Sequence, residues 1–149
     1  MAKTTIEPYL SFPGTAEKAI DFYVKCFDGE IMFLSRFSDL PAEDAEVGRN
    51  VDPNLILHAT VKIGESPLMM SDDPGPNFVH GNHMAVTWST DDEQQLRTVW
   101  DNFVKNGATV QMELEPSFFS PLFGVIKDPF GIQWMLMMYD ENEEQWSPE

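Results

Sequence analysis

The chain has 149 residues, of which 42% are hydrophobic and 12% aromatic, enough for one packed domain but too few for two independent ones. Its 25 acidic residues outnumber 9 basic ones, and the resulting formal charge of −16 disfavours nucleic acid and anionic membranes as partners. The single cysteine, Cys26, excludes an internal disulfide and a zinc site built from the thiolates of one chain. No apolar run has the length of a signal peptide or a membrane span, so we expect a cytoplasmic protein.

The first half of the chain predicts a strand, a helix and three further strands. Residues 6–12 alternate as a strand does, and Pro13-Gly14 break the pattern. Thr15 is suited to cap a helix over about 16–27, whose apolar residues form one stripe, and Gly29 is suited to the left-handed residue that ends it. A polar, exposed loop is expected over 38–54, and strands over 30–37, 55–63 and 67–71.

The second half predicts the same elements in the same order. The turn-forming residues 72–77 mark the midpoint, a strand is expected over 83–89, and Thr90 or Asp91 can cap a helix that runs to about 106. Gly107 closes this helix, and three strands follow over 108–114, 123–127 and 132–139.

The two halves match in detail as well as in order. Shifting the first helix stripe along the chain places all five of its apolar positions on the second stripe, and Leu68–Asp72 resembles Leu136–Asp140. Matching stripes, caps, element order and strand endings favour an internal duplication. The sequence therefore predicts an α+β fold of two β-α-β-β-β modules, about 6–72 and 81–140, in one domain over 1–149.

Several strings in this pattern resemble the vicinal-oxygen-chelate superfamily, which includes glyoxalase I, bleomycin-resistance proteins and extradiol dioxygenases. They are Ala19–Tyr23 in the first helix, His83–Val86 at the start of the second module, and Asp128–Gly131 before the last strand. Within the superfamily the chain is most similar to the PhnB-like branch, on Pro8–Phe12, His58-Ala59, Met69–Asp72, and Phe130-Gly131 with Trp134-Met135. The resemblance implies a cupped mixed sheet with helices on its convex face. Some PhnB-like relatives are labelled methyltransferases, but no glycine-rich loop supports that activity here.

The superfamily holds a divalent metal with residues from the first and last strands of each module. The resemblance puts His83 and Met135 at these places in the second module, and Pro67 with Glu7 or Pro8 in the first. Proline and thioether side chains do not bind hard divalent ions, so no metal and no cofactor are expected. The alternative is that Glu7, His58 or His80 completes a metal site with His83.

Strand alternation predicts which side chains line the cup. If His83 points inward, Thr87 does too, and His58 and Thr60 join them if the third strand follows the same pattern. The aromatic connection 118–124 could form a lid or half of a dimer contact. The candidate ligand-binding residues are His58, Thr60, His83, Thr87, Phe119, Gln133, Met135 and Tyr139. Two simpler interpretations are that the histidines only hydrogen-bond within the sheet, or that side chains fill the cup.

Three functions are compatible with this pattern. The leading hypothesis is a metal-independent protein that binds a small, largely apolar or aromatic ligand, as sequestration and resistance proteins do. The second is a metal-dependent isomerase, lyase or dioxygenase of the glyoxalase type, and the third is a structural or regulatory dimer. No serine or cysteine has the setting of a nucleophile, so no catalytic residue is assigned. The expected partners are the ligand and a second copy of the chain.

Overall fold

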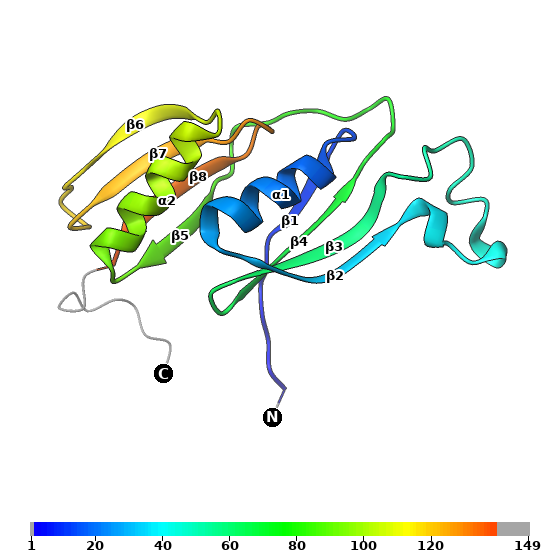
Figure 1. Ribbon diagram of the computed structural model, residues 1–149, viewed down its shortest axis with the longest axis horizontal. Coiled ribbons are helices and arrows are strands. Elements are labelled where there is room, and N and C mark those ends of the chain that lie inside the picture. Colours follow the sequence, from blue (N-terminus) through cyan, green and yellow to red (C-terminus); the bar gives the residue numbers. More distant parts are fainter. Residues whose placement is uncertain (1, 140–149) are drawn as a thin grey trace. The chain divides into compact units, whose positions relative to one another are not determined.

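The computed structural model describes residues 2–139 and divides the chain into two compact units, residues 1–79 and 80–149 (Figure 1). Both units have the element order β-α-β-β-β, which confirms the predicted α+β fold of two modules. Unit 1 contains β1 (Tyr9–Phe12), α1 (Ala16–Phe27), β2 (Glu30–Arg36), β3 (Ile56–Ile63) and β4 (Ser66–Asp72). Unit 2 contains β5 (Val86–Thr90), α2 (Glu93–Lys105), β6 (Thr109–Glu115), β7 (Phe123–Lys127) and β8 (Gln133–Met138).

Each unit is one four-stranded mixed sheet with its helix packed on one face. The strand order is β1-β4-β3-β2 in unit 1 and β5-β8-β7-β6 in unit 2, with the first pair parallel and the others antiparallel. In each unit the helix connects the first strand to the far edge of the sheet, and two antiparallel turns then bring the last strand back beside the first one and parallel to it. We call the face that carries the helix the helix face, and the opposite one the open face.

The helix faces hold the core of each unit. In unit 1 the stripe of α1, including Ile20 and Tyr23, packs against the alternate strand residues Phe12, Val61 and Met70, and all five are almost fully buried. In unit 2 the stripe of α2, namely Leu96, Val99, Trp100 and Phe103, covers Ile126, Trp134 and Leu136. Strand alternation therefore leaves the other half of the strand side chains on the open faces.

The first strands of both units are shorter than the sequence predicts. β1 begins at Tyr9 rather than at residue 6, because Pro8 and Pro67, which would extend the β1–β4 ladder, have no N–H to donate. β5 begins at Val86 rather than at His83, because its partner β8 starts only at Gln133, after a turn. His83 therefore lies in the irregular segment before the strand.

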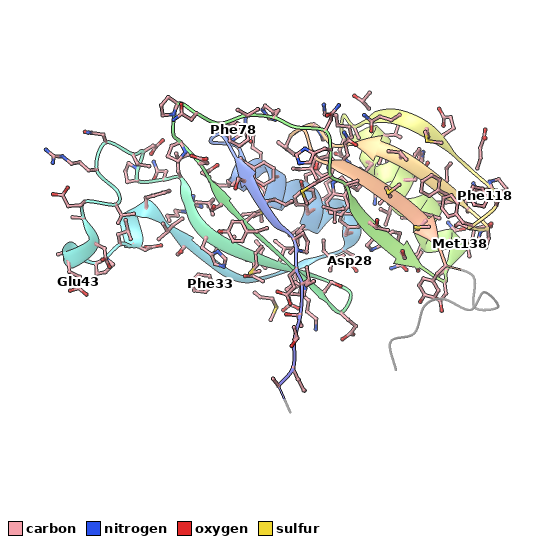
Figure 2. The ribbon with its side chains drawn as sticks, turned by 180° about the vertical axis from the view of Figure 1, so that it is seen from behind. Asp28, Phe33, Glu43, Phe78, Phe118 and Met138 are labelled. Atoms are coloured by element: carbon pink, nitrogen blue, oxygen red, sulfur yellow. The ribbon has the colours of Figure 1, made fainter. Side chains whose placement is uncertain are left out.

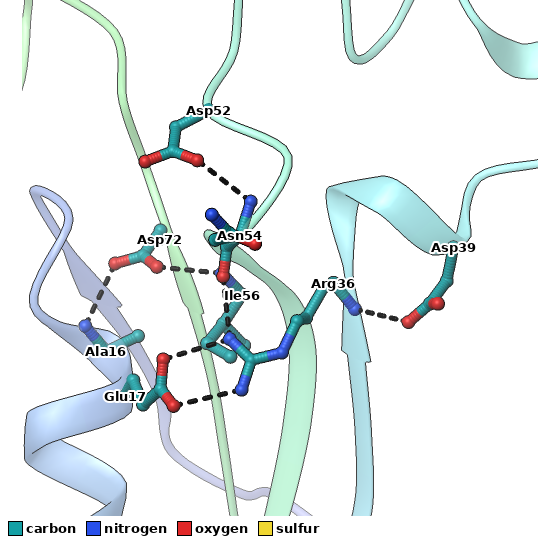
Figure 3. A network of polar contacts seen from close by, with 8 residues as sticks. All are labelled: Ala16, Glu17, Arg36, Asp39, Asp52, Asn54, Ile56 and Asp72. Atoms are coloured by element: carbon teal, nitrogen blue, oxygen red, sulfur yellow. Dashed lines mark hydrogen bonds and ion pairs between the residues drawn. The ribbon is translucent and has the colours of Figure 1, made fainter.

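The N-terminus of α1 is capped by a side chain from another element (Figure 3). Thr15 makes no capping hydrogen bond. Instead Asp72, at the end of β4, accepts hydrogen bonds from the backbone N–H of Ala16 at 2.9 Å and of Ile56 at 2.8 Å. At the other end of α1 the left-handed residue is Asp28, with φ of 55°, rather than Gly29. α2 ends at Lys105, and Gly107, two residues later, has a left-handed φ of 98°, in line with its predicted role of closing the helix.

A second polar group joins α1 to the end of β2. Both terminal nitrogens of Arg36 donate to the carboxylate of Glu17 at 2.9 Å, and one of them also donates to the carbonyl oxygen of Asn54 at 2.7 Å (Figure 3). These hydrogen bonds lower the pKa of the Glu17 carboxyl. They also tie down the end of the segment 37–55, which is exposed for the most part, as predicted, and contains two short 3-10 helices, Phe37–Asp39 and Ala42–Asp44.

The strand pairings correct the predicted alignment of the two halves by two residues. Leu10 of β1 pairs with Met70, and Trp88, at the equivalent helix-face position of β5, pairs with Leu136. Met70 and Leu136 are therefore equivalent positions of the two units. One residue earlier in each strand, Met69 is equivalent to Met135, whereas Pro67 is not. Leu68–Asp72 and Leu136–Asp140 are similar in sequence, but Leu68 and Leu136 do not occupy equivalent positions of the two sheets. Among the described residues no helix is long and apolar enough to cross a membrane.

Candidate functional site

The open face of unit 1 carries a row of four side chains, one from each strand. The pairings place Tyr9 of β1 opposite Met69 of β4, Met69 opposite Thr60 of β3, and Thr60 opposite Phe33 of β2. Tyr9 is 47% exposed and Phe33 is 54% exposed, which is unusual for large aromatic residues on a sheet. In Figure 2, which views this unit from the side opposite to Figure 1, Phe33 is labelled on the β2 edge. Two exposed aromatic side chains thus flank a thioether and a hydroxyl.

His58 lies beside this row, two residues before Thr60 on β3, and its half-buried ring contacts three members of the surrounding group. The Tyr9 hydroxyl is 2.9 Å from Nδ1, and the Thr60 hydroxyl is 3.4 Å from Nε2. The Tyr9 ring stacks on the imidazole, with centroids 5.6 Å apart and planes at 27°. The Phe33 ring lies 5.9 Å away on another strand and is tilted by 43°. We call Tyr9, Phe33, His58 and Thr60 the imidazole cluster.

The open face of unit 2 has the same geometry and a different chemistry. Its matching row consists of Thr87 on β5, Met135 on β8, Val125 on β7 and Met112 on β6. At these positions unit 2 therefore has one hydroxyl, two thioethers and an aliphatic side chain, and no aromatic ring. Such a surface is apolar and easily deformed, because methionine side chains are unbranched and polarizable.

The connection between β6 and β7 adds aromatic rings to the open face of unit 2. Phe123 pairs with Met137, and the ring of Phe119 lies 4.8 Å from that of Phe123 at an angle of 71°. Phe118, labelled in Figure 2, stacks edge-on against Phe119 at 5.1 Å and is 96% exposed. The buried hydroxyl of Ser120 shares its one proton between the carbonyl oxygens of Leu122 and Met138, at 2.9 and 2.6 Å, which anchors the connection to β8.

The eight residues predicted to bind a ligand fall into two groups by unit. His58 and Thr60 lie together on β3 of unit 1, on its open face as predicted. Thr87 and Met135 are paired neighbours on the open face of unit 2, with Gln133 at the start of β8. The other three lie outside the strands: His83 is exposed before β5, Phe119 is in the β6–β7 connection, and Tyr139 follows β8.

Sequence reasoning missed three residues of the site in unit 1. Tyr9, Phe33 and Met69 surround His58 and Thr60, yet none was a candidate. Alternation alone could have placed Tyr9, because Leu10 and Phe12 belong to the core and the odd residues must point the other way. Phe33 gave no such signal, because irregular pairing between Ile31 and Phe33 shifts the alternation of β2.

The residues at the superfamily's metal-binding places do not fit a divalent ion. Met135 offers a thioether, as does Met69, and Pro67 offers no ligand atom. Glu7 and His83 are both exposed in irregular segments, outside the strands that would hold them in a fixed geometry. Among residues 2–139 no three side chains of His, Cys, Asp or Glu come together as metal ligands would.

Comparisons with known proteins agree on one family. Residues 4–137 match the family model described as 3-demethylubiquinone-9 3-methyltransferase. Protein YjdN of Escherichia coli is 27% identical over 146 residues, which cover 94% of this chain and 99% of that protein. Protein PA1353 of Pseudomonas aeruginosa has a crystal structure that matches with a TM-score of 0.77 and 26% identity, over 92% of this chain and 98% of that one. A putative 3-demethylubiquinone-9 3-methyltransferase, PhnB protein, from Bacillus cereus matches with a TM-score of 0.72 and 26% identity, over 91% and 99% of the two chains.

Proposed function

Because the chain belongs to the PhnB-like family of the vicinal-oxygen-chelate superfamily, whose model is described as 3-demethylubiquinone-9 3-methyltransferase, we propose that it binds a small, largely aromatic or apolar molecule without a divalent metal. The imidazole cluster is the observation that carries this proposal. Tyr9 and Phe33 expose about half of their surface beside a histidine that is held in place by two hydroxyls. A mostly apolar surface with a few fixed polar groups is the usual composition of a ligand site.

Charge narrows the class of ligand. The strands of unit 1 contain two basic residues, Arg36 and Lys62. Arg36 is engaged with Glu17, and Lys62 lies near the end of β3, opposite Glu30 in the strand register. In a protein with a net charge of −16, a phosphorylated or carboxylated ligand would meet net electrostatic repulsion. We therefore propose a neutral or cationic ligand.

The methyltransferase description of the family has little support in this chain. Methyl transfer from a nucleotide-derived donor would need a pocket for that donor, commonly built on a glycine-rich turn between a strand and a helix. The turn from β1 to α1 contains one glycine, Gly14, and the turn from β5 to α2 contains Asp91 and Asp92 instead. Binding without methyl transfer is the simpler proposal.

The proposal is tested by metal analysis and ligand titration of the full chain. Purified protein should contain far less than one Zn, Mn, Fe or Ni ion per chain. In protein labelled with ¹³C at the methionine methyl groups, naphthalene should shift the Met69 signal, while naphthalene-2-carboxylate should not. A stoichiometric divalent ion that His83→Ala removes would overturn the proposal in favour of a glyoxalase-type metalloenzyme. A Met69 signal that does not move with naphthalene at its solubility limit would also overturn it.

We further propose that the protein is a cytoplasmic homodimer that uses the β6–β7 connection as a contact. Phe118 exposes 96% of its surface and stacks on Phe119, so a large apolar area faces water in the isolated chain. Phe118→Ser should weaken the dimer in analytical ultracentrifugation, while the control Met112→Ser, an exposed apolar residue on β6, should not. A monomeric wild type, or equal dimer affinity in Phe118→Ser, would contradict this assignment.

A further inference from the structure

We infer that Tyr9, His58 and Thr60 form a hydrogen-bond relay that selects a flat, neutral ligand with one hydrogen-bond donor and one acceptor at opposite ends. The inference rests on the proposed function and names its ligand more closely. Three observations carry it, namely the two hydroxyl contacts of one imidazole, the proton count of a neutral histidine, and the aromatic surface around it.

The first observation is that both ring nitrogens of His58 are engaged by hydroxyl groups. Tyr9 Oη is 2.9 Å from Nδ1 and Thr60 Oγ1 is 3.4 Å from Nε2, so the two hydroxyls lie on different sides of the ring. Each comes from a side chain on the open face, Tyr9 from β1 and Thr60 from the same strand as His58. The imidazole thus connects two hydroxyl groups that are otherwise separate.

The second observation is chemical. A neutral imidazole has one N–H donor and one nitrogen acceptor. If Tyr9 donates to Nδ1, then Nε2–H donates to Thr60, and the Thr60 proton points outward while Tyr9 presents only lone pairs. If Nδ1–H donates to Tyr9, then Thr60 donates to Nε2, and the Tyr9 proton points outward while Thr60 presents lone pairs. In both tautomers the relay offers the ligand one donor and one acceptor.

The consequence is a rule for recognition. A ligand with a donor at one end and an acceptor at the other matches the relay in either direction, because His58 can change its tautomer to suit. A ligand with two acceptors meets one hydroxyl that has no proton to give, and the mismatch leaves a polar group without its hydrogen bond. The relay therefore discriminates between ligands by the number of hydrogen-bond donors that they carry.

The third observation gives the shape of the ligand. The Tyr9 ring, on β1, stacks on the imidazole of His58 at 5.6 Å, and the Phe33 ring, on the adjacent strand β2, lies 5.9 Å from it. A flat aromatic ring can pack against such exposed aromatic side chains, either offset-stacked or edge to face. The Met69 side chain, between Tyr9 and Thr60 in the row, can adapt to the edge of such a ring.

The test compares two probes that differ in one proton. Methyl 4-(hydroxymethyl)benzoate has a donor and an acceptor at opposite ends of a benzene ring, and methyl 4-(methoxymethyl)benzoate has two acceptors. Both are titrated into the methionine-labelled full chain at about pH 8. The wild type should bind the hydroxymethyl probe about five to ten times more tightly, which corresponds to roughly one hydrogen bond.

Three variants separate the relay from ordinary contacts. His58→Phe keeps a ring beside Tyr9 and frees both hydroxyls to donate, so the two probes should bind with about equal affinity. His58→Leu is the second variant in case His58→Phe does not fold. It also frees both hydroxyls to donate, so the ratio should again be close to one. Thr98→Val, at an exposed position on α2 of unit 2, should leave the wild-type ratio unchanged.

The outcomes distinguish this inference from the proposed function. Equal affinity of the wild type for both probes, with a clear shift of the Met69 signal, would overturn the relay and leave the binding function standing. A preference that His58→Phe retains would also overturn the relay. If neither these probes nor naphthalene shifts the Met69 signal, the binding function itself fails. A preference that is lost in His58→Phe and kept in Thr98→Val supports the relay.

Discussion

Asp72 makes the sharpest prediction about stability, because one buried carboxylate serves two elements. It is 6% exposed and accepts the N–H groups of Ala16 and Ile56, both of which are fully buried. Asp72→Ala leaves two buried donors without partners, at about 1 to 3 kcal/mol each. The variant should therefore lose about 2 to 6 kcal/mol, a large share of the 5 to 15 kcal/mol typical of folded proteins.

The assay is urea unfolding followed by circular dichroism, together with amide hydrogen exchange. Asp72→Ala should lower the midpoint with little change of slope, and exchange should accelerate most at Ala16 and Ile56. Asp52→Ala is the matched control, since this exposed aspartate accepts one backbone N–H, from Asn54 at 2.9 Å (Figure 3). Its cost should stay below about 1 kcal/mol. The reasoning is refuted if Asp72→Ala is no less stable than Asp52→Ala.

Two further predictions concern an ion pair and a close packing contact. The lowered pKa of Glu17 means that its pairing with Arg36 adds stability above the ordinary carboxyl pKa of 4.5, and that this stability is lost as the pH falls through the lowered value. Urea midpoints of wild type and Glu17→Gln should differ at neutral pH and converge in acid, and a difference that persists in acid would contradict the assignment. Gly124→Ala should cost about 1 to 3 kcal/mol in thermal unfolding, because its new Cβ would lie 2.5 Å from the Trp100 ring. An unchanged melting temperature would show that Trp100 can move aside.

The sequence predicted the helices and the element order well because those signals are local. The stripe of α1 and the glycine at the end of α2 are each set by residues a few positions apart. The cap of α1 was missed for the opposite reason. Thr15 is the local candidate for the cap, but the acceptor of the Ala16 N–H is Asp72, which lies 56 positions away in the chain. Nothing in residues 13–18 indicates that a strand end would supply the acceptor.

The candidate site was predictable in part, and the limit was strand register. Alternation placed His58 and Thr60 on one face of β3, which the pairings bear out. The contact of Tyr9 with His58 spans 49 positions and depends on the register of β1 with β4 and of β4 with β3. A similarity between two strand endings was enough to set the repeat wrong by two residues, and with it the counterpart of Met135.

In each unit most of the buried core lies on the helix face of the sheet, whereas the rows of candidate residues lie on the open face. The helix face buries Trp134 and Leu136 in one unit and Met70 and Val61 in the other, while the open-face strand residues, apart from Phe123, are only partly buried or exposed. Most substitutions on the open face should therefore cost little stability, so the chemistry of this face can change without compensating mutations in the core. The row of Tyr9, Met69, Thr60 and Phe33 in unit 1 and the row of Thr87, Met135, Val125 and Met112 in unit 2 occupy matching strand positions, and they show how far two such surfaces can differ within a single polypeptide.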